Sequence, residues 1–231
     1  DLHYPLRRQR QMCIRDRLYV DLWWQGLNVA LDPGTFQYNA RPPWNNALIT
    51  AQVHNTMTLD GQDQMTQAGR FLWLDWAQAE VLAHEVDEFG QITRITAEHN
   101  GFRKLSARHQ RTIKSTDSGW IIEDVVLPYG KSQDKVHQAQ LTWLLPDWTW
   151  QLEAGNKLRI IGQGFSFTLQ IEGVLKLNLF RGGERLLGEI EPQPTWGWAS
   201  PSYGNKQPAL MIKAEIMENL PIKFQSIWNF D

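Results

Sequence analysis

The chain has 231 residues and a net charge of −2, and 42% of its residues are hydrophobic. This composition is ordinary for a globular protein, and the length allows one large β-sandwich. The near balance of 23 basic and 25 acidic residues argues against a nucleic-acid partner, and no run of about 18 apolar residues predicts a membrane span. The single cysteine, Cys13, excludes an intrachain disulfide.

The first seventeen residues have neither the alternation of a strand nor the apolar face of a helix. Their last six residues, Met12–Arg17 (MCIRDR), resemble translated adaptor sequence. We therefore predict that residues 1–17 are a poorly structured, non-native segment and that residues 18–231 form the domain. The alternative is a basic, solvated arm. Because the chain does not begin with methionine and shows no signal peptide, we expect the true N-terminus to lie upstream.

From residue 18 onward, runs rich in Val, Ile, Thr and aromatic residues alternate with period two, which predicts strands. In the first half these runs are 18–29, 48–59, 70–86, 91–99, 106–114 and 120–127. In the second half they are 138–145, 148–153, 157–161, 165–171, 175–180, 209–217 and 222–228.

Tight-turn sequences such as Asp60-Gly61 and Asn100-Gly101 separate these runs. The best helical candidate, residues 77–88, has β-branched and aromatic neighbours that argue against a helix. About a dozen strands at this spacing predict an all-β fold, a multi-layer antiparallel β-sandwich. Residues 192–208 are rich in Pro, Gly and Ser, and they predict a long loop that is functional or covers a sheet edge.

No nucleotide-binding glycine loop, zinc-finger spacing or nucleophile elbow is present. Few residues are candidates for a catalytic or binding role. Asp32 precedes Pro-Gly. A turn in which its side chain bonds the backbone is sufficient to explain it. His109 and Arg111 lie two residues apart on one strand face. We predict that they pair with an acidic residue across the strands, such as Glu98 or Glu123.

Eight motifs occur in an order that resembles the C-terminal β-sheet domain of the heparinase II/III family of polysaccharide lyases. They are Asp-Leu-Trp-Trp-Gln-Gly (21–26), Asp-Pro-Gly-Thr-Phe-Gln-Tyr (32–38), His-Asn-Thr (54–56), Leu-Asp-Gly-Gln-Asp-Gln (59–64), Gly-Arg-Phe (69–71), His-Asn-Gly-Phe-Arg (99–103), His-Gln-Arg (109–111) and Gly-Trp-Ala-Ser-Pro-Ser-Tyr-Gly (197–204). Each motif alone is weak. Their order and spacing make the resemblance fairly specific, and it covers nearly everything after residue 17.

The resemblance implies a two-part enzyme in which an N-terminal α/α toroid supplies most catalytic groups and the β domain closes the substrate cleft. Such enzymes cleave uronic-acid-containing chains by β-elimination. The sequence has no series of amphipathic helices for a toroid, so we expect a fragment that is inactive alone. The implied partners are an acidic polysaccharide and the missing toroid of the same chain, in a periplasmic or secreted protein.

The resemblance also implies a structural metal, typically zinc. Carried onto this sequence, two of its ligands are Asp32 and His54. The third, a histidine in an N-terminal His-x-Asp or His-x-His motif, would fall at Ile14 inside the suspect segment. A stable zinc site usually has four donors, so this departure puts the site in doubt. The alternative for His54 is a half-buried histidine satisfied within the fold.

The expected substrate-facing residues come from two regions. One region lies near His54 in sequence and comprises Tyr38, Asn55, Gln62 and Gln64, which line the cleft in this interpretation. In the alternative, Asn55 bonds the backbone and the two glutamines lie on a turn. Trp196 and Tyr203, with Trp198 between them, form a sugar-stacking platform or cap the sandwich edge. The 12 tryptophans also keep open a second function, a non-catalytic carbohydrate-binding module.

Overall fold

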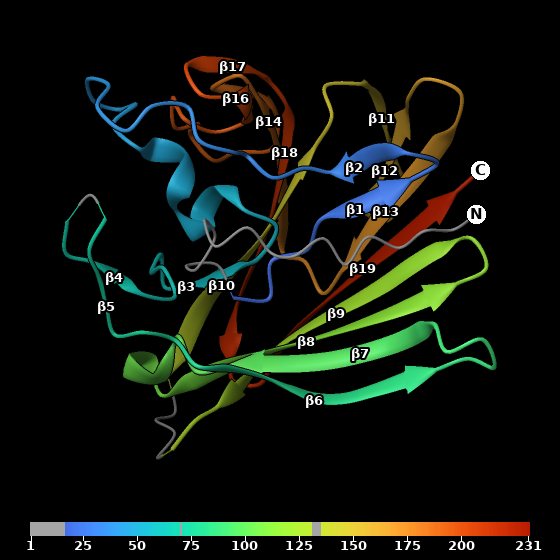
Figure 1. Ribbon diagram of the computed structural model, residues 1–231, viewed down its shortest axis with the longest axis horizontal. Helices are drawn as coiled ribbons and strands as arrows, with labels where there is room; N and C mark the ends of the chain where they lie inside the picture. Colours follow the sequence, from blue (N-terminus) through green and yellow to red (C-terminus); the bar gives the residue numbers. More distant parts are fainter. Residues whose placement is uncertain (1–16, 70, 131–134) are drawn as a thin grey trace.

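The computed structural model describes residues 17–69, 71–130 and 135–231, and it is an all-β structure of two large antiparallel sheets (Figure 1). The smaller sheet has five strands in the order β15-β14-β18-β10-β3. The larger sheet has eight strands in the order β11-β12-β13-β19-β9-β8-β7-β6. The predicted multi-layer antiparallel sandwich is confirmed. The described residues contain nineteen strands rather than about a dozen, because several are only two to four residues long.

The five-stranded sheet consists of β3 (Met57–Leu59), β10 (Val136–Leu145), β14 (Lys176–Arg181), β15 (Glu184–Leu187) and β18 (Leu210–Asn219). The eight-stranded sheet consists of β6 (Ala79–Val86), β7 (Ile92–His99), β8 (Ala107–Thr116), β9 (Gly119–Pro128), β11 (Thr149–Glu153), β12 (Lys157–Ile161), β13 (Ser166–Glu172) and β19 (Ile222–Phe230).

Shorter elements connect the sheets. Three two-stranded ribbons are β1 (Leu22–Trp24) with β2 (Leu27–Ala30), β4 (Thr66–Gln67) with β5 (Trp73–Leu74), and β16 (Trp198–Ser202) with β17 (Asn205–Pro208). The 3₁₀ helices are η1 (Ala47–Ile49), η2 (Ala51–Val53) and η3 (Arg103–Leu105). No helix among the described residues is long and apolar enough to cross a membrane.

The core lies between the two sheets, where alternate side chains of both point inward. Trp143 of β10 and Trp228 of β19 meet across it as fully buried rings, 5.1 Å apart and nearly perpendicular. The indole of Trp143 donates to Ser226 Oγ at 2.9 Å, so its polar edge is satisfied inside the core. These two tryptophans are packing residues.

Part of the outer face of the five-stranded sheet is polar and buried, around Lys213. Lys213 Nζ donates to Gln52 O and to Gln140 Oε1, each at 2.7 Å, and lies 4.4 Å from the centre of the Trp196 ring. Burial lowers the pKa of Lys213 to about 7. Trp196 itself is 5% exposed. It therefore covers this face as the wall against which Lys213 packs, and it does not point to solvent.

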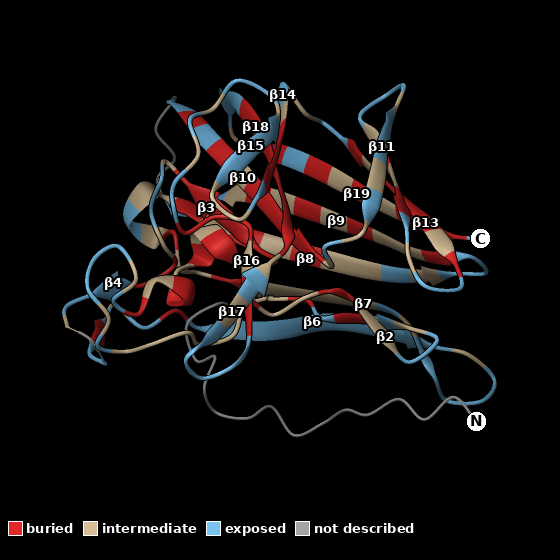
Figure 2. Cartoon of the chain, turned by 90° about the horizontal axis from the view of Figure 1, so that it is seen from above, coloured by how far each residue is buried: buried red, intermediate tan, exposed pale blue. Residues whose placement is uncertain are grey.

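The eight-stranded sheet extends beyond the five-stranded one. All eight residues of β6 are exposed, as Figure 2 shows along the lower edge. Apolar side chains follow this edge, among them Val81, Leu82 and, at the hairpin end, Phe89, which is 78% exposed. Within the described residues, this apolar sheet edge is left without a covering layer.

Three predicted strands differ from the structure, and two of them are divided by a tight turn. Residues 18–29 form the β1–β2 hairpin, since Gln25 and Gly26 both have positive φ and turn the chain back. The run predicted over 70–86 is divided into β5 and β6, with Asp75 at φ 58° between them. In both cases a tight turn built on positive φ interrupts an unbroken alternating pattern.

The predicted strand 48–59 is mostly η1 and η2, followed by the short β3. Backbone bonds from Val53 N to Thr50 O and from His54 N to Ala51 O close the second 3₁₀ turn, and Asp63 Oδ1 accepts from Ala51 N at 3.1 Å. Nearly every side chain of this segment is buried. Its apolar residues therefore reflect burial on several sides rather than one face of a strand.

The predicted loop 192–208 contains the β16–β17 ribbon and lies against the segment after β2 (Figure 1). Ser200 N donates to Pro33 O at 2.8 Å, and Gly204 N donates to Phe36 O at 2.7 Å. A Cβ on Gly34 would lie 2.2 Å from Ser200 O, so only glycine permits this approach. The Asp-Pro-Gly motif therefore docks the two segments together.

Candidate functional site

A fully buried polar cluster joins β7, β8 and β9 through His99, His109, Arg111 and Asp124. His109 Nε2 lies 2.6 Å from Asp124 Oδ1, and Arg111 donates from Nε at 2.7 Å and from Nη2 at 3.0 Å to the two oxygens of the same carboxylate. Each of the four residues is at most 3% exposed. They form one connected hydrogen-bonded unit inside the sandwich.

This cluster corrects the predicted partners of His109 and Arg111. Glu98 bonds Arg108 at 3.0 Å, and Glu123 pairs with Lys223. The β8–β9 register places Arg111 opposite Asp124, on the inward face, whereas Glu123 has the opposite parity and faces outward. The predicted structural role of the pair across strands is confirmed, with Asp124 as its acid.

The hydrogen bonds assign the proton positions of both histidines. Gly101 N–H donates to His99 Nδ1 at 3.0 Å, so His99 carries its proton on Nε2 and donates to His109 Nδ1 at 3.1 Å. His109 Nε2–H then donates to Asp124. Burial lowers the pKa of both histidines, that of His99 well below its ordinary value. Burial also disfavours the Asp124 carboxylate, but Arg111 and His109 outweigh this effect and lower the pKa of Asp124.

Two neutral buried histidines predict acid-sensitive stability. The unfolded chain protonates them near pH 6.5, their ordinary value, while the folded chain does so only at lower pH. The unfolded state thus binds more protons as pH falls below about 6.5, and we expect the free energy of unfolding to fall with it. Urea unfolding between pH 7.5 and 5.5 measures this. His99→Gln should make the free energy of unfolding less dependent on pH, whereas His84→Ala, at an exposed position, should not change this dependence. Equal slopes in the unmodified chain and the two variants would contradict the assignment.

The same region anchors the chain at residues 17–20. Gln64 accepts from Arg17 N at 2.6 Å and donates to Arg17 O at 3.1 Å, and Arg111 Nη1 donates to Leu18 O at 2.6 Å. Asn55 donates to Val20 O and Leu31 O, and its Oδ1 accepts from Leu144 N at 2.7 Å. The side chains of Asn55 and Gln64 are buried and engaged with backbone, the alternative that the sequence left open for Asn55. Residues 1–16 of the suspect segment lie outside the described residues.

Asp32 and His54 both face structural partners. Asp32 Oδ1 accepts from Gly34 N at 2.7 Å, the turn geometry that the sequence also allowed. His54 is 3% exposed, and its Nδ1 donates to Thr50 O at 2.8 Å. No group of three or more His, Cys, Asp or Glu residues within 17–69, 71–130 and 135–231 is arranged to hold a metal. The described donors alone therefore do not make a zinc site.

Tyr38 and Tyr203, 165 residues apart in sequence, meet on the surface with ring centres 5.4 Å apart. Phe71 packs on Tyr38 at 5.2 Å. Phe71 and Tyr203 are 63% and 60% exposed. We call these three residues the aromatic surface. Gln62 is also exposed, so three of the six residues predicted to face substrate lie at or near the surface, while Asn55, Gln64 and Trp196 are buried.

A second aromatic group lies beside it and was not singled out as a unit. Lys206 Nζ lies 3.1 Å from the ring centre of Trp198 and 4.1 Å from that of Trp44, and burial lowers its pKa. Phe36 meets Trp44 edge-on at 5.6 Å. These residues come from two distant segments, so no short sequence pattern connects them.

The family described as "Heparinase II/III-like, C-terminal" matches residues 5–224. A comparison with curated protein sequences returned no match.

Two solved structures share the fold. A heparinase III gene product superposes with a TM-score of 0.69 at 16% identity, over 94% of this chain and 30% of its own. Heparan sulfate lyase HepC from Pedobacter heparinus superposes with a TM-score of 0.68 at 17% identity, over 93% of this chain and 30% of its own. The chain thus spans about a third of the length of these proteins.

Proposed function

Because the chain belongs to the heparinase II/III-like C-terminal family, we propose that it is the β-sandwich part of a polysaccharide lyase acting on uronic-acid-containing glycans by β-elimination. The observation that carries this proposal is the family match over residues 5–224. Two solved relatives that are named as a heparinase and a heparan sulfate lyase, and that are about three times longer, support it. The remainder of the enzyme is an N-terminal α/α toroid that holds most of the catalytic groups.

In this proposal the β-sandwich shapes one wall of the substrate cleft. The aromatic surface, with exposed Phe71 and Tyr203 beside Tyr38, offers flat rings on which sugar units stack. Gln62 adds an exposed amide near it in sequence. The polar cluster around Asp124 fixes β7, β8 and β9 and anchors residues 17–20.

The experiment that tests the function uses the parent protein with its upstream sequence. It is incubated with heparan sulfate, heparin and alginate, and the ultraviolet absorbance of the unsaturated uronate product is followed. We expect product from the parent protein and none from this chain alone. A folded parent protein that produces no unsaturated ends from any uronate polymer refutes the proposal.

Zinc remains part of the proposal only in a protein that carries the N-terminal histidine motif. There Asp32 and His54 would supply two of the donors. Elemental analysis of a parent protein that carries the intact histidine motif is expected to find zinc that His54→Ala removes, with His84→Ala as the control. Zinc content unchanged by His54→Ala would contradict the ligand assignment.

A further inference from the structure

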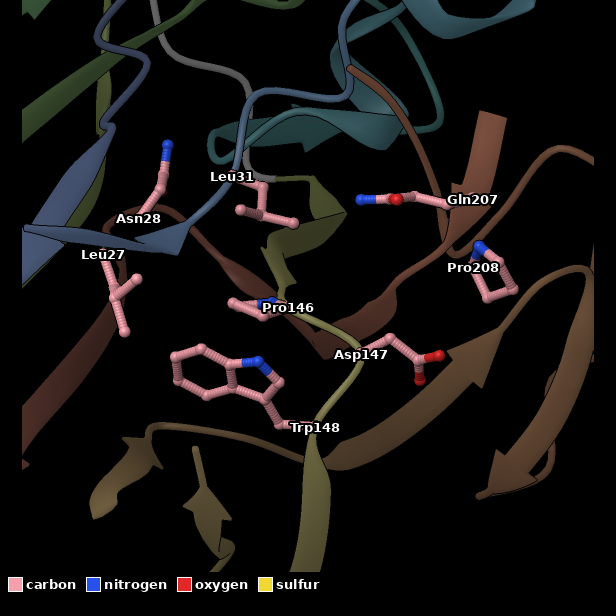
Figure 3. Close-up of a pocket in the computed structure, with 8 residues that line it drawn as sticks. All are labelled: Leu27, Asn28, Leu31, Pro146, Asp147, Trp148, Gln207 and Pro208. Carbon is pink, nitrogen blue, oxygen red and sulfur yellow. The ribbon is translucent and has the colours of Figure 1, made fainter. Parts of the chain in front are cut away.

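A pocket of about 340 Å³ opens between the β1–β2 ribbon, the connection from β10 to β11 and the end of β17 (Figure 3). Trp148, Pro146 and Pro208 give it apolar walls. Asn28, Asp147 and Gln207 add polar groups. Its lining does not include Tyr38, Tyr203 or Lys206, so it is separate from the residues described above. A volume of this size and a mixed lining are typical of small ligand sites.

The indole of Trp148 is held in a fixed orientation. Its ring meets Phe165 and Phe167 edge-on at 5.8 and 6.4 Å, which joins it to the core. A Cβ on Gly162 would lie 2.4 Å from the ring, so glycine is required for the indole to seat there. Trp148 nevertheless remains only half-buried and lines the pocket. It is therefore a preformed aromatic platform that loses little entropy on binding.

The polar groups around the platform are suited to hydroxyl groups rather than to an ion. Arg181 donates to both oxygens of Asp147, at 2.6 and 2.7 Å, which neutralises the carboxylate locally and leaves its remaining lone pairs as acceptors. The exposed amide of Gln207 extends across the space toward Leu31 (Figure 3).

Asn28 also lines the pocket, with its amide held in place. Its Nδ2 donates to Asp21 Oδ1 at 2.7 Å, and this bond fixes the amide orientation. The Oδ1 atom is buried and has no hydrogen-bond partner among the described residues. An oxygen that solvent does not reach is not offered to a ligand, so Asn28 contributes a fixed side of the pocket rather than a hydrogen bond.

From this geometry we infer that the pocket binds a pyranose ring of a glycan chain, with its C–H face on Trp148 and its hydroxyls on Gln207 and Asp147. A pyranose combines an apolar face with a rim of hydroxyls, which matches a flat indole surrounded by neutral acceptors and an amide. The inference rests on the proposed function only for the class of polymer. It places a second contact with that polymer outside the cleft wall formed by the aromatic surface.

Binding of heparan sulfate oligosaccharides and of a neutral oligosaccharide to this chain, followed by calorimetry, tests the inference. We expect Trp148→Ala to weaken binding about tenfold and Gln207→Ala to weaken it severalfold, while Trp76→Ala, an exposed tryptophan far from the pocket, leaves it unchanged. Thermal unfolding checks that each variant is folded. If Trp148→Ala does not fold, Gln207→Ala, at an exposed position, still tests the inference. Absence of binding by the folded chain, or binding unaffected by both variants, overturns the inference.

The outcome is separable from that of the lyase assay. Trp148-dependent binding by this chain together with an inactive parent protein refutes the proposed function alone. An active parent protein whose β-sandwich binds no oligosaccharide through Trp148 refutes the pocket alone.

Discussion

Replacing Asp124 by alanine is expected to lower the free energy of unfolding by about 3–5 kcal/mol, because the change leaves a buried guanidinium and a buried imidazole without their shared acceptor. Arg111 makes a bidentate contact with this carboxylate, and His109 bonds it at 2.6 Å. The three residues are 0–3% exposed. Urea denaturation at pH 7.5 measures the loss.

The neighbouring residue on β9 provides the matched control. Glu123 pairs with Lys223 on the outer face, where the two side chains are 34% and 56% exposed. Exposed ion pairs contribute little, so Glu123→Ala should cost less than about 1 kcal/mol. Equal costs for the two variants would show that the buried cluster does not hold the three strands together.

Replacing Trp143 by alanine is the second large effect, expected at about 3–5 kcal/mol. The change removes a fully buried indole that packs on Trp228 at 5.1 Å and bonds Ser226 Oγ, and the sandwich cannot collapse fully to fill the space. Thermal and urea unfolding both report it.

Trp23→Ala is the comparison for Trp143. Trp23 is 58% exposed and makes one hydrogen bond, to Asp21. Surface substitutions of this kind change stability by about 0.5 kcal/mol or less. A Trp143→Ala variant as stable as Trp23→Ala would contradict the assignment of Trp143 to the core between the sheets.

The fold class was predictable because period-two alternation and tight-turn chemistry recur along almost the whole chain. The long strands show it best: β10, β18 and β19 lie close to the predicted runs at 138–145, 209–217 and 222–228. Local sequence patterns gave wrong strands where tertiary packing determines the backbone conformation. The 3₁₀ turns over 47–53 are buried on several sides. Asp75 divides an alternating run through a positive φ, and no glycine beside it indicates a turn in the sequence.

The candidate site was predictable only in part, because its members meet through long-range packing. Tyr38 and Tyr203 were each singled out, and the structure joins them. Asn55 and Gln64 have the polar character of ligand-binding residues, but their amides are engaged with the backbone at residues 17–31 and with Leu144. The choice of Asp124 over Glu123 follows from strand register, which sequence alternation alone does not specify.

The apolar edge along β6 fits the two-part interpretation. Val81, Leu82 and Phe89 are exposed on a strand that nothing among the described residues covers. An exposed apolar edge of this kind is typical of a surface that another domain or chain covers.

The formation of unsaturated uronate ends is the measurement that tests the central claim most directly. The account predicts that the parent protein, with the α/α toroid joined to this sandwich, generates them from at least one uronic-acid polymer, and that the sandwich alone generates none. A folded parent protein without any such product, or a parent protein that releases only saturated ends, would contradict it.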